Sequence, residues 1–174
     1  MHQKTTTIVF LSAATACGAA VMLAPRSATA DLDEDKCDIV DGQLSEDPGG
    51  AACPTDHPNC FIGAIHGHKL HASTLFFGEG SVAAPPTSPN WFCYSGVTTY
   101  TTSAGVLATR ETGLVTNIPI PQSTPPSSRA SLSMEVITGG TGEFAGASGY
   151  LFVNGFVDPN RHVTSHVFGK ICRP

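Results

Sequence analysis

The sequence predicts an all-β protein: an antiparallel, closed β-barrel of about eight strands in meander order, calycin-like in outline. From Phe61 onward no stretch has a helical period, and two-fold alternation with β-branched residues dominates. Short turn signals separate the alternating segments, which favours pairing between consecutive strands. A meander leaves two sheet edges unpaired, and closure into a barrel removes both of them.

Turn residues divide the chain into six alternating segments. The expected strands are 61–82 (which we expect to be two strands broken near 72–73), 91–102, 105–116, 130–138, 149–157 and 162–172. Ser103 and Ala104 predict a tight hairpin, and residues 158–160 predict a short proline turn. Between 139 and 149, three glycines in four residues indicate a longer hairpin of unusual backbone shape. We expect Phe144 in that hairpin to plug one end of the barrel.

The pattern of apolar residues in two expected strands predicts which of their side chains point into the barrel and which point outward. In 130–138, apolar side chains alternate with polar ones, so we expect Leu132, Met134 and Val136 to face inward and Glu135 outward. In 149–157 both faces are apolar, because Tyr150, Phe152 and Phe156 alternate with Leu151 and two valines. A strand of this kind must be covered on both sides. The outer cover is a loop, the N-terminal segment or a second subunit.

The first thirty residues resemble a secretory signal peptide. Lys4 gives a positive start, residues 5–23 are apolar or small, and Ala28 and Ala30 form a cleavage site before Asp31. The uninterrupted apolar run is shorter than the ~20 residues of a membrane span, so we expect no span. An alternative is a lipoprotein anchored through Cys17, since residues 14–17 loosely match a lipid-attachment motif. We favour cleavage after Ala30 and a secreted, extracytoplasmic protein.

Residues 31–59 are acidic, contain glycine and proline, and lack periodicity, so we expect a solvated segment ahead of a barrel domain at 60–174. Cleavage would remove two bases and no acid, which takes the net charge from −5 to −7. From Pro48 onward, acids and bases balance. Without a basic patch the chain is not expected to bind nucleic acid.

Five cysteines follow the predicted cleavage site, and an exported chain uses cysteines for disulfides. An odd number leaves one thiol over. Cys53 and Cys60 either pair within their own loop or connect that loop to the barrel. In the second case we expect Cys60 to bridge Cys172 or Cys93, depending on the end of the barrel at which it lies.

Few residues in the sequence are candidates for catalysis or for contact with a ligand. Glu111 and Glu135 lie in the middle of neighbouring strands, and either would be a candidate catalytic acid or base if it faced the lumen. Glu135 shares its face with Ser131 and Ser133, which favours an exterior place. Tyr94 and Tyr100 point to the same face of their expected strand, because they are an even number of residues apart. They and Phe152 are candidate ligand contacts.

Histidines form one cluster with metal-ligand spacing. His66 and His68 project to one face of a strand, as two metal ligands would. His71 is expected on the opposite face unless a bulge intervenes. No third ligand lies within reach by spacing, so we expect no metal and no other cofactor.

Residues 134–170 resemble the C-terminal part of the allene oxide cyclase-like barrels. The likeness rests on a strand, the turn Gly-Gly-Thr-Gly-Glu-Phe-Ala-Gly, a second strand, a proline turn and a last strand. Dirigent-like proteins carry a similar turn. The resemblance implies an eight-stranded barrel, assembly into a homodimer or homotrimer, and reactions of an isomerase or cyclase inside an apolar cavity.

Three functions follow from these observations. The first is a secreted barrel that holds a small, largely apolar molecule in its lumen. The second is an isomerase or cyclase of the allene oxide cyclase-like type. The third is a non-catalytic surface or matrix protein with a packed barrel. An open lumen without ionisable groups favours the first, an open lumen with a buried ionisable side chain the second, and a filled lumen the third.

Overall fold

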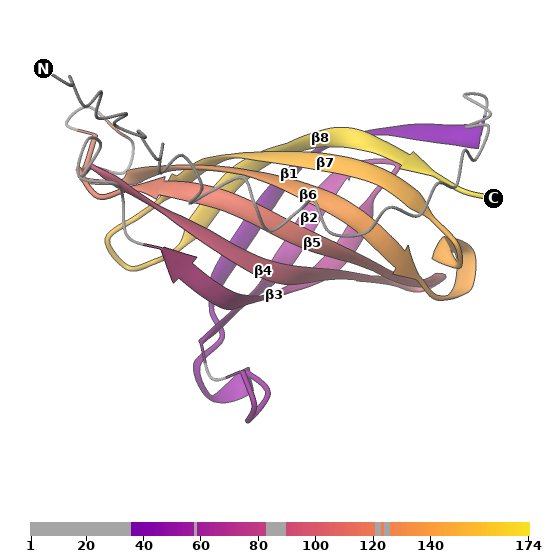
Figure 1. Cartoon of the computed structure of the whole chain (residues 1–174), viewed down its shortest axis with the longest axis horizontal. Helices are drawn as coiled ribbons and strands as arrows, with labels where there is room; N and C mark the ends of the chain where they lie inside the picture. The colour runs from indigo at the N-terminus through magenta and orange to yellow at the C-terminus, as the bar shows by residue number, and fades with distance from the viewer. Residues whose placement is uncertain (1–35, 58, 83–89, 121–122, 124–125) are drawn as a thin grey trace, which may run out of the picture.

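The structure is a computed structural model, and it describes residues 36–57, 59–82, 90–120, 123 and 126–174. Eight antiparallel strands form a closed barrel in which each strand pairs with the next along the chain and the last pairs with the first (Figure 1). The predicted fold class is therefore confirmed. The elements are β1 (Cys37–Pro48), η2 (Gly50–Ala52), β2 (Cys60–His68), β3 (His71–Val82), β4 (Trp91–Thr102), β5 (Gly105–Thr116), β6 (Arg129–Gly140), η3 (Gly142–Phe144), β7 (Ser148–Val157) and β8 (Val163–Cys172).

The barrel begins at Cys37, so the prediction of a solvated segment up to residue 59 is wrong for β1. This strand closes the barrel, because it pairs with β2 along one edge and with β8 along the other. Val40 and Leu44 are buried on its inner face, while Asp41 is exposed. Only two of the inward positions carry large apolar side chains, so the alternation of β1 is weak in the sequence.

The predicted break within residues 61–82 falls slightly earlier than expected. β2 ends at His68 and β3 begins at His71, so the turn is at Lys69 and Leu70. Lys69 has a left-handed backbone (φ 64°), and Leu70 is buried in the core. The other five expected strands match the observed ones within two residues at each end.

The faces of β6 are the reverse of those predicted. Leu132 is 49% exposed and Met134 and Val136 are also exposed, whereas Ser133 and Glu135 are buried. The alternation itself is correct, but the polar face points into the barrel. The reason is that the facing strands offer hydroxyl groups as hydrogen-bond partners inside the lumen.

β7 is apolar on both faces, as predicted. Leu151 and Val153 are buried inside the barrel, and Tyr150 and Phe156 are exposed on the outside. Phe152 stacks on Phe168 of β8, with ring centroids 5.3 Å apart. The outer side chains of β6, β7 and β8 therefore form a continuous exposed apolar band, which consists of Leu132, Met134, Val136, Tyr150, Phe152, Phe156 and Phe168.

One end of the barrel is filled, and the glycine-rich hairpin fills it. Phe144, on η3, is 1% exposed and belongs to the core together with Leu107, Ile137 and Ile171. The guanidinium of Arg173 lies over its ring, 5.2 Å from the centroid. η3 lies at the end of the barrel near the C-terminus (Figure 1). The prediction that Phe144 is a buried plug is confirmed.

Two disulfides are present among the described residues. Cys37 pairs with Cys172 and thereby joins the first strand to the last, and Cys53 pairs with Cys60 within the loop that contains η2. The alternative of a bridge within that loop is confirmed, and bridges from Cys60 to Cys172 or Cys93 are wrong. No described cysteine of the 174-residue chain is free, and this includes Cys93. The expectation of one leftover thiol concerns the chain after cleavage at Ala30 and stays a prediction.

The predicted signal peptide (residues 1–30) and the alternative lipid anchor at Cys17 lie outside the described residues. Among the residues that the structure describes, no helix has the length and apolarity that crossing a membrane requires.

Candidate functional site

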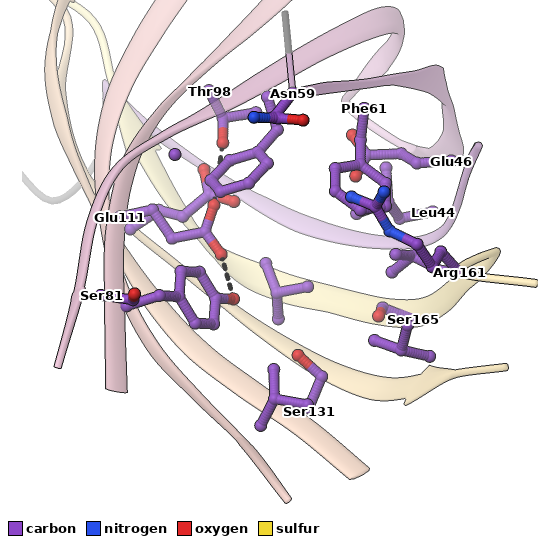
Figure 2. Close-up of a pocket in the computed structure, with 18 of the residues that line it drawn as sticks. Leu44, Glu46, Asn59, Phe61, Ser81, Thr98, Glu111, Ser131, Arg161 and Ser165 are labelled. Atoms are coloured by element: carbon purple, nitrogen blue, oxygen red, sulfur yellow. Dashed lines mark hydrogen bonds between the residues drawn. The ribbon is translucent and has the colours of Figure 1, made fainter. Parts of the chain in front are cut away.

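The barrel encloses a cavity of about 590 Å³ at the end away from η3. We use the name rim for four apolar side chains of its lining, Phe61, Phe76, Phe92 and Val157; all but Phe76, in the middle of β3, lie within one residue of a strand end. Deeper in the lumen, the carboxyl groups of Glu46, Glu111 and Glu135 line the cavity, and Figure 2 labels the first two. The volume falls in the range of sites that bind small molecules, and a mainly apolar wall with a few convergent polar groups is typical of them.

Glu111 is held by two hydroxyl groups from the neighbouring strand. Tyr94 donates to its Oε1 at 2.7 Å, and Thr98 donates to its Oε2 at 2.9 Å; both bonds are drawn in Figure 2. Tyr94 reaches this carboxyl by crossing Gly113 of β5. A Cβ atom at Gly113 would lie 2.5 Å from Cζ of Tyr94, so only glycine leaves room for the ring.

Glu135 has the same kind of support, one layer deeper. Tyr100 donates to both carboxyl oxygens, at 2.8 and 2.9 Å, and Thr109 donates to Oε2 at 2.7 Å. Glu135 is 1% exposed and Tyr100 is completely buried. The expectation that Glu135 lies outside is therefore wrong, because these hydroxyl groups supply the hydrogen bonds that a buried carboxyl requires.

Sequence reasoning missed Glu46, because it lies in the segment that we expected to be solvated. It is buried on β1, and Thr74 of β3 donates to its Oε1 at 2.6 Å. The signal that was available is the two-fold alternation from Val40 to Glu46, with polar residues between the inward positions. Glycine at one of those inward positions weakens that signal.

Burial changes the protonation of these groups. Burial raises the pKa of Glu46 to about 7; the Thr74 bond lowers it, and the charge of Glu111 raises it further. Burial, followed by the charge of Glu111, raises the pKa of Glu135 well above its ordinary value. Burial and the Glu135 charge also raise the pKa of Tyr100, so its hydroxyl stays a proton donor. Burial therefore favours the protonated forms of Glu46 and Glu135, and the pKa of Glu46 is near 7.

The structure brings some predicted site residues together and separates others. Glu111, Glu135 and Tyr94 line the cavity, while Tyr100 lies behind it and contacts it through Glu135. Phe152 lies in the outer apolar band, away from the lumen, so it is not in the cavity wall. Tyr94 faces the lumen and Phe152 faces outward because of their positions in the two-fold alternation of their strands. The sequence shows this alternation but does not show which of the two sets of side chains points inward.

The histidine cluster lies on the outer surface. His66 and His71 are cross-strand partners on β2 and β3, with their Nδ1 atoms 3.3 Å apart, so the expectation that His71 points the other way is wrong. The turn at residues 69–70 places it on a separate strand with the same outward direction. His68 is exposed as well. Within the described ranges, no group of three or more His, Cys, Asp or Glu side chains is arranged to hold a metal.

Fold and cavity together define a class of protein: an up-and-down β-barrel, open toward one end, with a lumen lined by carboxyl groups. Comparisons with protein-family models, with curated proteins and with solved structures gave no match for this chain. The resemblance to allene oxide cyclase-like barrels thus stays a prediction that rests on residues 134–170.

Proposed function

We propose that this protein binds a small, largely apolar molecule in the lumen of its barrel. The observation that carries the proposal is the cavity of about 590 Å³, whose rim is formed by aromatic and aliphatic side chains. A cavity of this size also argues against a packed barrel with a purely structural role. Binding in a preformed cavity needs little rearrangement of the protein.

The test uses two neighbouring residues on β7. Val157 lines the rim and Phe156 is exposed on the outer face of the same strand. We expect Val157→Trp to abolish binding of the neutral fluorescent probe N-phenyl-1-naphthylamine, because the indole fills the entrance, while Phe156→Trp binds it as the original chain does. Circular dichroism checks that both variants fold. Equal probe binding by both variants, or none by the original chain, would contradict the proposal.

A second candidate is an isomerase or cyclase, which an open lumen with buried ionisable side chains favours; binding is the step that both candidates share. A carboxyl whose pKa is near 7, such as Glu46, suits a general base, and a carboxyl whose pKa is raised well above its ordinary value, such as Glu135, suits a general acid. Glu46 would take a proton from a carbon beside a carbonyl, while Glu135 gives its proton to the carbonyl oxygen. Glu46 then gives the proton it took to the far carbon of the resulting dienol, and the dienol hydroxyl returns its proton to Glu135, which restores both carboxyl groups and completes the isomerisation.

Cyclohex-3-enone, which changes its ultraviolet absorption when its double bond moves into conjugation, tests this candidate. We expect faster conversion with the original chain than with Glu46→Gln or Glu135→Gln, and conversion unchanged by Asp47→Asn on the outer face of β1. Rates equal to buffer alone for all four proteins would remove the isomerase.

For location and assembly we propose a secreted protein that forms a homodimer or homotrimer. The two disulfides are compatible with an extracytoplasmic protein, and the exposed apolar band on β6–β8 supports self-association. Mass spectrometry of the exported protein is expected to find Asp31 at its N-terminus, and a lipid-modified Cys17 would overturn this. Sedimentation is expected to give a dimer or trimer.

A further inference from the structure

Among the residues that the structure describes, no cation is paired with the three carboxyl groups of the lumen. Within the described part of the chain, every ion pair involves other residues, such as Arg110 with Glu79 or His162 with Asp47. The recorded partners of Glu46, Glu111 and Glu135 are hydroxyl groups of threonine and tyrosine. A buried carboxyl group either keeps its proton, which the raised pKa values of Glu46 and Glu135 favour, or is paired with a positive charge, which a cation entering the lumen would supply.

These hydroxyl groups also leave acceptor positions unused. A carboxylate has about four lone-pair sites, whereas Glu46 accepts one recorded bond and Glu111 accepts two. Both side chains line the cavity, so the remaining sites are available to a donor that enters it.

A second, independent observation points to the same place. Ser165 of β8 lines the cavity and is only 2% exposed, and its Oγ atom has no hydrogen-bond partner. Ser165 and Glu46 both lie along the cavity wall in Figure 2. A buried hydroxyl group without a partner is uncommon and is explained when a ligand supplies the missing bond.

The two arginines that line the cavity do not replace this cation. Arg161 lies over the ring of Phe61 at the rim, 5.1 Å from its centroid, and Arg129 is exposed at the start of β6. An anionic ligand that paired with these two arginines would have to place its apolar body among the carboxyl groups. A cationic ligand places its charged group deep and its apolar body against the rim.

We propose that the lumen ligand carries a protonated amine, which lies among Glu46, Glu111 and Glu135 and hydrogen-bonds to Ser165, with an apolar body that extends toward the rim. This inference rests on the proposed binding function and adds the class of ligand. The amine supplies the positive charge and the N–H donors that the lumen lacks.

Three probes of equal length test the proposal: decylamine, decanol and decanoic acid. Each competes near neutral pH with N-phenyl-1-naphthylamine, whose own binding reports the lumen. Charge-assisted bonds are expected to make decylamine bind about tenfold to a hundredfold more tightly than decanol. Decanol or decanoic acid binding as tightly as the amine, while the fluorescent probe still binds, would overturn the amine and leave the binding function intact. Failure of the fluorescent probe itself would overturn both.

Substitutions of the lumen glutamates then test where the amine binds. Glu46→Gln and Glu111→Gln keep the shape of the side chain and remove its charge, so each is expected to reduce the preference for decylamine over decanol about tenfold. Asp47→Asn is the matched control, because Asp47 follows Glu46 on β1 and is exposed. A preference that survives both glutamine variants, or that falls equally in Asp47→Asn, would contradict the proposed site.

Discussion

Glu111 and Glu135 are direct cross-strand partners on β5 and β6, and both carboxyl groups enter the lumen. Like charges directly opposite each other on a sheet destabilise it. The pair is tolerated because each carboxyl receives bonds from a tyrosine and a threonine, and because burial and the charge of Glu111 raise the pKa of Glu135, which favours its protonated form. The pairing of these two residues places two carboxyl groups side by side in the lumen.

Glu111→Gln is expected to lower the pKa of Glu135, because it removes a neighbouring negative charge that raises this pKa. The measurement is a carbon-13 NMR titration of the glutamate side-chain carboxyls. Glu79→Gln serves as a control, since Glu79 is paired with Arg110. A Glu135 titration that is the same in Glu111→Gln and in the original chain would show that the two groups do not interact.

The barrel is expected to lose stability as pH rises from about 5 to about 8. In the folded state the pKa of Glu46 is raised from 4.5 to about 7, so the folded chain holds a proton that the unfolded chain has released. The stabilisation is complete below pH 4.5 and is lost as pH rises through 7. Its size is roughly 3 kcal/mol in the free energy of unfolding.

Urea denaturation at both pH values measures this loss. Glu46→Gln is expected to remove roughly 3 kcal/mol of it, while the raised pKa of Glu135 leaves a remaining loss of the same sign. Glu143→Gln, at an exposed position of η3, should show the full loss of the original chain. An unchanged pH dependence in Glu46→Gln would mean that Glu46 ionises normally.

Replacing Cys37 and Cys172 by serine is expected to cost more stability than replacing Cys53 and Cys60. The first bridge spans 135 residues and the second spans 7. Loop-closure entropy alone gives roughly 5 kcal/mol for the long loop and roughly 2.5 kcal/mol for the short one. Chemical denaturation of both double variants is the measurement. Equal losses would mean that native contacts, and not the length of the loop, determine the effect.

Gly142→Val is expected to destabilise the barrel more than Gly50→Val. Both glycines have left-handed backbones, with φ of 59° and 52°. A Cβ at Gly142 would lie 2.0 Å from the carbonyl oxygen of Ala104, whereas none of the atoms around Gly50 comes within 4 Å. Backbone strain costs about 1–3 kcal/mol at either site, and only Gly142→Val adds a steric clash. Thermal unfolding measures the difference, and equal shifts would contradict the packing around η3.

Phe144→Ala tests the closed end of the barrel. Loss of this buried ring is expected to cost about 3–5 kcal/mol in the free energy of unfolding. Binding of N-phenyl-1-naphthylamine should remain, because the cavity opens toward the other end. If binding were lost while the thermal midpoint stayed the same, η3 would belong to the binding site and not to the structural core.

The sequence by itself determined the fold class, most of the strand boundaries and the buried position of Phe144. Periodicity and turn residues act over a few neighbouring positions, so they are legible in a single chain. They also identified Glu111 and Tyr94 as candidates for the lumen, whereas they favoured an exterior place for Glu135.

Only the tertiary structure decided which face of each strand is inside. For β6 alternation divides the side chains into Leu132, Met134 and Val136 against Ser133 and Glu135, and both directions satisfy the two-fold period. The polar set is inside because Tyr100 and Thr109, distant in sequence, meet Glu135 there. Glu46 escaped prediction for the same reason, since its burial depends on Thr74 and on closure of β1 against β8. Hydrogen bonds between distant strands set the free energy of a buried carboxyl, and a local pattern does not contain them.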